Sequence, residues 1–158
     1  MERGRYYQEH SQYSRGYYQD KVTEGIEFQN LVIEHLFKRG LAVHTYLNKT
    51  YKDNRHGLRE FRAEIKKDSM FTRTNNLYIE TEWKKSPKDT NFIPSGPYRK
   101  GCKLFIIGNS STIYIFSSKK LKEVSSEYFT KEKTTSKGFL LPVEDAERYC
   151  VIRVDLQE

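Results

Sequence analysis

Two short segments between residues 57 and 84 alternate polar and apolar side chains, and this alternation constrains the fold more than any other feature. The apolar positions are Phe61, Ala63 and Ile65 in the first segment, and Leu77, Ile79, Thr81 and Trp83 in the second. Side chains of a strand point alternately to its two faces, so each segment has an apolar face for a core and a charged face. If the two segments pair as an antiparallel hairpin, both charged faces lie on the same side of the sheet.

The charged face of such a hairpin is a candidate metal site. Alternate residues of a strand lie about 6.6 Å apart, so Glu80 and Glu82 can lean toward one ion, and Asp68 can join them from the neighbouring strand. Mg²⁺ prefers oxygen ligands, usually one or two carboxylates with water and phosphate in the remaining positions. Lys84, further along the same face, is placed to meet a phosphate or an attacking hydroxide. The pattern suits metal-assisted hydrolysis of a phosphodiester.

The same residues carry a resemblance to a known family. The spacing D-x11-E-x-(E/K) after an N-terminal helix resembles the PD-(D/E)XK nuclease superfamily. The string EIKKD…TNNLYIE followed by PSG is similar to the short phage and prophage members, and the resemblance covers residues 22–125. It implies an α/β (α+β) fold with a restriction-endonuclease-like core, a mixed β-sheet flanked by helices in the order αβββαβ. It also implies a Mg²⁺- or Mn²⁺-dependent endonuclease that hydrolyses DNA and often acts as a homodimer.

The resemblance assigns roles to five residues of this chain. Asp68 and Glu80 would hold the metal, and Glu82 would be a further ligand or a base. Lys84 would orient or deprotonate the water, with Lys66 in reserve. Glu82 is a departure from the family pattern, which usually has lysine at this position.

Two other alignments with the family pattern remain open. One takes Glu82-Trp83-Lys84 as the E-x-K element, and the other takes Glu64-Ile65-Lys66, with Asp53 as the earlier aspartate. We prefer Asp68 and Glu80 because the next pair of strands follows them at a suitable distance.

The remaining elements form one expected domain, residues 21–158, after a polar, tyrosine-rich N-terminal arm of residues 1–20. We expect a helix over 21–39 that ends at Gly40, a strand within 41–52, and a hairpin of strands 103–108 and 112–117. A short helix begins at the lysines of 119–122. Closing strands at 139–143 and 149–156 flank a helical turn over 144–148.

The loop after Lys84 is rich in proline and glycine and carries candidate nucleic-acid contacts. Ser95, Arg99 and Lys100 could bind a phosphate through the backbone and side chains. The net charge of +7 and the isoelectric point of about 9.3 favour a polyanionic partner, with DNA first.

Other features of the sequence exclude rival classes of protein. No apolar run approaches the length of a membrane span and the N-terminus has no signal-peptide core, so we expect a cytoplasmic protein without a membrane partner, in the host cytoplasm if a phage encodes it. Cys102 and Cys150 stand singly in apolar surroundings, which is typical of reduced cysteines. The sequence contains no phosphate-binding GxxxxGK loop, zinc pattern or evident nucleophile triad.

Three alternatives to the nuclease hypothesis remain. A hairpin with one solvated charged face is common, and cross-strand Glu–Lys pairs alone can explain it. The chain could also be a nuclease-like fold that has lost its chemistry and serves as a nucleic-acid-binding or protein-interaction module, as the departure at Glu82 suggests. A phage-borne inhibitor of another protein is the third alternative.

Overall fold

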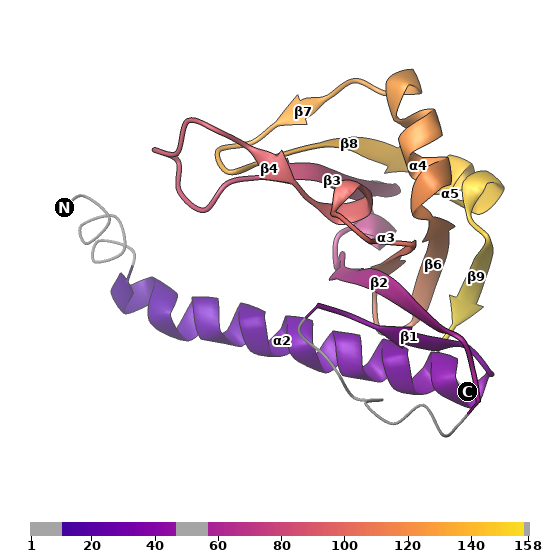
Figure 1. Ribbon diagram of the computed structural model, residues 1–158. Coiled ribbons are helices and arrows are strands. Elements are labelled where there is room, and N and C mark those ends of the chain that lie inside the picture. The colour runs from indigo at the N-terminus through magenta and orange to yellow at the C-terminus, as the bar shows by residue number, and fades with distance from the viewer. Residues whose placement is uncertain (1–10, 47–56, 157–158) are drawn as a thin grey trace.

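The computed structural model describes residues 11–46 and 57–156, which form an α+β fold with curled mixed β-structure flanked by helices (Figure 1). The long helix α2 (Ser11–Lys38) lies along one side of the strands, and its N-terminal half extends beyond them. It begins upstream of the predicted residue 21, so residues 11–20 of the predicted arm are helical. Residues 1–10 lie outside the described part. The helix ends at Lys38, one residue before the predicted end at 39, and the predicted stop residue Gly40 has a φ of 90°, a left-handed conformation that suits glycine.

A five-stranded mixed sheet forms the centre of the described structure. Its strands, in spatial order, are β1 (Ala42–His44), β2 (Glu60–Lys67), β5 (Leu104–Gly108), β6 (Thr112–Ser117) and β9 (Ile152–Asp155). β1, β2 and β5 are parallel, whereas β6 runs antiparallel to both β5 and β9. The predicted hairpin over residues 103–117 is therefore confirmed, and the strand predicted within 41–52 is the short β1.

The second sheet is antiparallel and has four strands among the described residues. Their spatial order is β4 (Ile93–Pro94), β3 (Asn76–Trp83), β8 (Ser136–Pro142) and β7 (Lys131–Glu132). The short helices are α3 (Phe71–Thr74), η2 (Gly96–Tyr98), α4 (Ser118–Val124), η3 (Ser125–Glu127) and α5 (Val143–Tyr149). The helix expected at 119–122 and the helical turn expected at 144–148 are thus present, as α4 and α5.

The predicted hairpin between the two alternating segments is wrong. The segments are β2 and β3, but β2 pairs with β1 and β5, whereas β3 pairs with β4 and β8. The cause is the direction in which each strand buries its apolar face. Ala63 and Ile65 of β2 pack in the core under α2, whereas Leu77 and Ile79 of β3 pack in a second core. The chain crosses from one sheet to the other through α3 instead of folding back beside β2.

The two cores lie on opposite faces of the five-stranded sheet. The first contains Phe28, Val32, Ile33 and Leu36 of α2 with Ile106, Ile113 and Ile115 of β5 and β6. The second contains Phe105, Ile107, Tyr114 and Phe116 of the same two strands with Leu77, Ile79, Phe139 and Leu141 of the second sheet. β5 and β6 are therefore buried on both faces, which explains why their sequences are almost continuously apolar.

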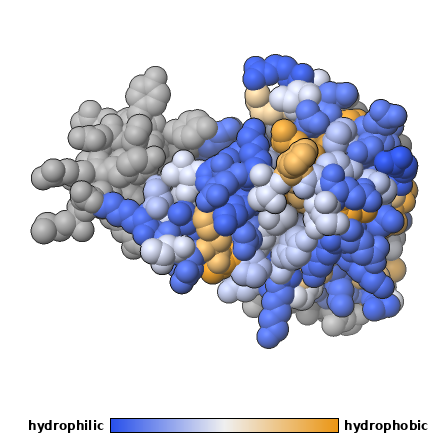
Figure 2. All heavy atoms as spheres, turned by 90° about the horizontal axis from the view of Figure 1, so that it is seen from above, coloured by the Kyte–Doolittle hydropathy of each residue, from blue (hydrophilic) through white to orange (hydrophobic). Residues whose placement is uncertain are grey.

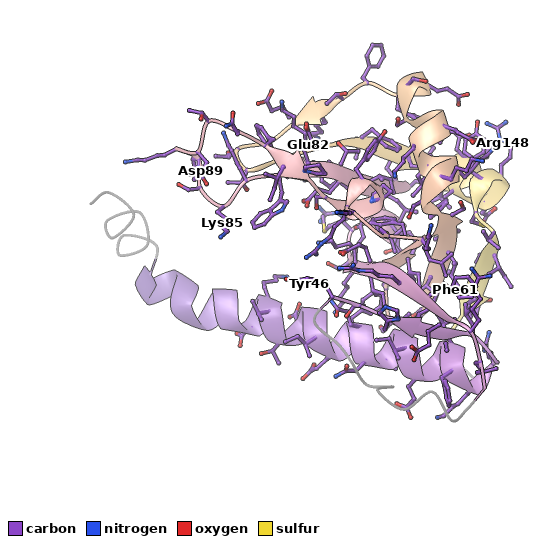
Figure 3. The ribbon with its side chains drawn as sticks, viewed as in Figure 1. Tyr46, Phe61, Glu82, Lys85, Asp89 and Arg148 are labelled. Atoms are coloured by element: carbon purple, nitrogen blue, oxygen red, sulfur yellow. The ribbon has the colours of Figure 1, made fainter. Side chains whose placement is uncertain are left out.

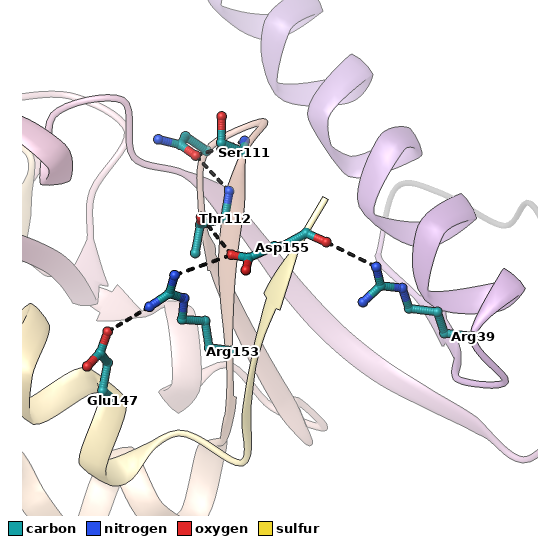
Figure 4. A network of polar contacts seen from close by, with 7 residues as sticks. Arg39, Ser111, Thr112, Glu147, Arg153 and Asp155 are labelled. Atoms are coloured by element: carbon teal, nitrogen blue, oxygen red, sulfur yellow. Dashed lines mark hydrogen bonds and ion pairs between the residues drawn. The ribbon is translucent and has the colours of Figure 1, made fainter. Parts of the chain in front are cut away.

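Polar contacts attach the last strand to its neighbours (Figure 4). The carbonyl oxygen of Asp155 accepts a hydrogen bond of 3.0 Å from Arg39, which follows α2. The carboxylate of Asp155 accepts one of 3.2 Å from Thr112 at the start of β6. Arg153 donates to Glu147 of α5 over 3.0 Å. These contacts are exposed, so each stabilises the fold only modestly, but together they fix β9 between the helices.

The surface seen from above in Figure 2 is mainly hydrophilic, with small hydrophobic areas between the polar side chains. No helix of residues 11–46 and 57–156 combines the length and apolarity that a membrane crossing requires. Cys102 and Cys150 are both free, as predicted, and Cys102 is buried.

The second core predicts the effect of a matched pair of substitutions. Leu77 is fully buried, whereas 40% of Leu140 on β8 is exposed. We expect Leu77→Ala to lower the free energy of unfolding by about 2–5 kcal/mol because it leaves a cavity, and Leu140→Ala to lower it by less than about 1 kcal/mol. Urea denaturation measures both values. Equal losses would show that the second core does not depend on β3.

Candidate active site

The charged face of β2 forms one wall of the candidate site. Phe61, Ala63 and Ile65 pack in the core under α2. Because side chains of a strand alternate, Glu64 and Lys66 point to the opposite face, the side on which the second core lies. Glu64 is half-buried and Lys66 is exposed. The alternation predicted for this segment is thus confirmed, and it places an E-x-K pair beside the second sheet.

A tight turn at residues 95–99 docks on β3. The backbone N–H of Ser95 donates to the carbonyl of Thr81 over 2.9 Å, and the N–H of Arg99 closes the turn on the carbonyl of Gly96. Gly96 has a φ of 55°, and a Cβ atom at this position would overlap with the carbonyl oxygen of Glu80. Only glycine allows the two backbones to approach so closely.

This turn holds two carboxylates that come from different sheets. The hydroxyl of Ser95 donates to the Glu80 carboxylate of β3 over 2.6 Å. At the other end of the turn, the guanidinium of Arg99 donates to the Glu64 carboxylate of β2 over 3.0 Å. Both are charge-assisted hydrogen bonds, which are stronger than those between neutral groups. The side chain of Glu64 is only 13% exposed, whereas that of Arg99 is 39% exposed, so the carboxylate is largely shielded from water and the guanidinium is partly open to it.

Tyr46 and Cys102 surround the Arg99 end of the turn. The guanidinium of Arg99 lies 4.4 Å from the centre of the Tyr46 ring, and that of Arg62 lies 5.5 Å from it. Such cation–π contacts restrict where an arginine can move. Cys102 is buried beside Glu64, and burial raises the pKa of its thiol. The thiol is therefore protonated at neutral pH and leaves Glu64 as the negative group in this part of the site.

Asp68 lies just after β2, and its carboxylate accepts hydrogen bonds from two backbone amides. It accepts a hydrogen bond of 2.9 Å from the N–H of Met70 and one of 3.1 Å from the N–H of Tyr78. The carboxylate therefore joins the end of β2 to β3, two residues before Glu80. Burial raises the pKa of Tyr78, and the negative charge of Glu80 raises it further.

Glu82 and Lys84 belong to another part of the second sheet. The pairing of β3 with β8 shifts between Glu80 and Glu82, and such a bulge reverses the alternation of side chains. Glu82 lies 4.0 Å from Lys137 on β8, and the ammonium of Lys84 lies 4.6 Å from the ring centre of Phe92. In Figure 3, Glu82 lies toward the projecting β3–β4 loop that carries Lys85 and Asp89. The expectation that Glu80, Glu82 and Lys84 share one face is wrong.

The residues predicted to bind phosphate have different surroundings from one another. Ser95 is buried and its hydroxyl donates a hydrogen bond to the carboxylate of Glu80, whereas Arg99 forms an ion pair with Glu64. Lys100 is exposed. The preferred alignment also missed Glu64, although the alternative E-x-K pattern of residues 64–66 contained the signal for it. Asp53, the partner in that alternative, lies outside the described residues.

The acidic residues of the site could supply a divalent cation with no more than two protein ligands. Within residues 11–46 and 57–156, no three His, Cys, Asp or Glu side chains are grouped to hold a metal. Mg²⁺ and its substitute Mn²⁺ need just one or two carboxylates when water and phosphate complete the coordination. Glu64 and Glu80 are the two carboxylates that the turn at residues 95–99 holds.

Comparison with known proteins adds no relationship to this geometry. No family model matches the chain, and neither a curated protein nor a solved structure is significantly similar to it. The resemblance to the PD-(D/E)XK superfamily therefore stays a hypothesis that depends on the residues described above.

The partly buried ion pair of the site predicts a measurable coupling. We expect a double-mutant cycle of Glu64→Gln and Arg99→Met to give a coupling free energy of about 1 kcal/mol or more, because water shields this pair poorly. The pair of Glu34 and Lys38 on α2 is 65% and 69% exposed and serves as the control, with about 0.5 kcal/mol or less expected. Denaturant unfolding of the single and double variants measures both couplings. Equal values would contradict the proposed shielding of the site.

Proposed function

We propose that this chain is a metal-dependent endonuclease that hydrolyses DNA phosphodiester bonds. The observation that carries the proposal is the turn at residues 95–99, which holds Glu64 and Glu80 from two different sheets. Lys66 is exposed on the same face of β2 as Glu64, so one half-buried pair of carboxylates is accompanied by a cation accessible to substrate. The E-x-K alignment over residues 64–66 fits this geometry better than the one that uses Glu82 and Lys84.

Glu64 and Glu80 would hold Mg²⁺ or Mn²⁺, and Asp68, which follows β2, is bonded to the backbone of β3 two residues before Glu80. The ion would lower the pKa of a bound water and stabilise charge on the phosphate. Lys66 neutralises the scissile phosphate and orients the attacking water. Arg99 pairs with Glu64 before the substrate binds. Once a metal ion compensates the charge of Glu64, the guanidinium can instead donate its hydrogen bond to a phosphate oxygen of the substrate.

Basic residues near the turn support DNA as the substrate. Four exposed lysines, which we call the basic band, lie along the turn, the start of β5 and α4: Lys100, Lys103, Lys119 and Lys122. The backbone joins these segments, because the N–H of Ser118 donates to the carbonyl of Lys103. Binding through such contacts releases counterions, so affinity for DNA should fall steeply with salt concentration. A homodimer remains an expectation from the family resemblance.

Cleavage of plasmid and oligonucleotide DNA with Mg²⁺ or Mn²⁺ tests the proposal. We expect Glu64→Gln and Glu80→Gln each to lower the rate by at least about a hundredfold, because both carboxylates act in the transition state. Glu34→Gln, on the exposed face of α2, is the matched control and should keep the full rate. A chelator should abolish cleavage. Cleavage that survives in both site variants would contradict the assignment.

A binding module without chemistry is the second candidate, and one observation favours it. The hydrogen bonds of Ser95 and Arg99 already engage one oxygen of each carboxylate within the protein. The same substrates distinguish the two functions. Salt-sensitive binding of DNA by the wild-type chain, without cleavage in either metal, would support the module and exclude the nuclease.

A further inference from the structure

A cavity of about 460 Å³ opens beside the candidate site. Its lining includes Thr81, Glu82, Tyr98, Ser125, Tyr128 and Phe139. The volume lies within the range of about 300–1,000 Å³ that is typical of small-molecule sites. The second sheet forms one wall, and the residues that follow α4 form the other. Nothing in the proposed hydrolysis uses this cavity.

Aromatic rings form much of the cavity wall. Tyr128 stacks on Phe139 with 5.2 Å between ring centres and 11° between ring planes. The hydroxyl of Tyr128 donates to Asp145 over 2.6 Å, which fixes the ring in place. Burial raises the pKa of Tyr128, and its bond to Asp145 raises it further, so the wall stays neutral at physiological pH. Neutral aromatic faces of this kind stack well on nucleobases.

The polar groups of the lining favour a ligand that donates hydrogen bonds. Glu82 contributes a carboxylate, which accepts hydrogen bonds and does not donate them. The hydroxyl of Ser125 donates to the carbonyl of Lys122, so Tyr98 must be the donor in its 2.8 Å contact with Ser125. Glu82 is therefore the charged acceptor at the cavity. A carboxylate is the group that accepts from the exocyclic amino group of cytosine.

The cavity also adjoins the elements that would hold a DNA strand. Thr81 of its lining follows Glu80, and Pro94 precedes Ser95. Lys122 of the basic band lies with its ammonium 5.6 Å from the ring centre of Tyr98. Lys137 lies 4.0 Å from Glu82. Lys122 and Lys137 could therefore contact the phosphates of a DNA strand bound at the turn, one on each side of the cavity.

We propose that this cavity binds one unstacked nucleobase that carries an exocyclic amino group, such as cytosine, in preference to thymine, which has none. The base would come from single-stranded or locally opened DNA, stack beside Tyr98 and Tyr128, and donate its amino group to Glu82. The inference rests on the proposed function for the presence of DNA at the turn. It goes further because it names the form of the substrate and a base preference.

Binding of short single-stranded oligonucleotides to the full chain, with a chelator to prevent cleavage, tests the inference. Three probes differ at one central position, which is cytosine, thymine or an abasic site, in a strand whose other positions are all abasic. We expect the cytosine probe to bind about five to ten times more tightly than the thymine probe, and the abasic probe to bind most weakly. Fluorescence anisotropy measures the three affinities.

Two variants connect the preference to the cavity. Thr130→Trp fills the cavity from an exposed lining position, and we expect it to make the three probes equal. Thr134→Trp, at an exposed position outside the lining, is the control and should keep the wild-type order. Glu82→Met should bring cytosine and thymine to equal affinity but keep the weaker binding of the abasic probe, because the aromatic wall is intact.

The outcomes separate this inference from the proposed function. Equal affinities of the wild-type chain for all three probes would overturn the inference, even if the chain cleaves DNA. A cytosine preference that persists in Thr130→Trp would overturn it as well, because the base would then bind elsewhere. Loss of cleavage in every metal, with the preference retained, would contradict the nuclease and leave the base site standing.

Discussion

The docking of one short turn on β3 is the contact on which the candidate site depends. Gly96 lets the turn meet the backbone of Glu80 directly, and the amide of Ser95 anchors it to Thr81. From this position the two ends of the turn reach carboxylates of both sheets, Glu80 through Ser95 and Glu64 through Arg99. A side chain at position 96 would separate the backbones and remove both contacts at once.

Much of the fold follows from patterns within single segments. The alternation of Phe61, Ala63 and Ile65 predicts a strand with one buried face, and the continuous apolar runs at 104–108 and 112–117 predict a buried hairpin. Pairing between distant segments could not be predicted in the same way. The polar–apolar alternation of β2 and β3 would be the same in either of two arrangements. The strands could pair with each other in one sheet, or lie in different sheets and bury their apolar faces in two separate cores. The two cores decide between these arrangements, and their partners are remote in sequence.

The site shows the same division between local and distant information. The sequence indicates the strands that carry Glu64, Lys66 and Glu80, with Asp68 directly after the first of them. It also singles out the loop with Ser95 and Arg99. It does not reveal the bulge after Glu80, which separates Glu82 and Lys84 from the predicted face. It also does not reveal that Ser95 and Arg99, expected to bind phosphate, hold carboxylates instead. A hydroxyl or guanidinium suits either anion, so only the tertiary structure identifies its partner.

The position of a bound metal ion tests the central claim most directly. Crystals soaked in Mn²⁺ give an anomalous signal that locates the ion without assumptions about catalysis. The account predicts an ion within about 2.0–2.5 Å of carboxylate oxygens of both Glu64 and Glu80, at the turn of residues 95–99. An ion bound at Glu82 instead, or no ion at the turn at saturating Mn²⁺, would contradict the account.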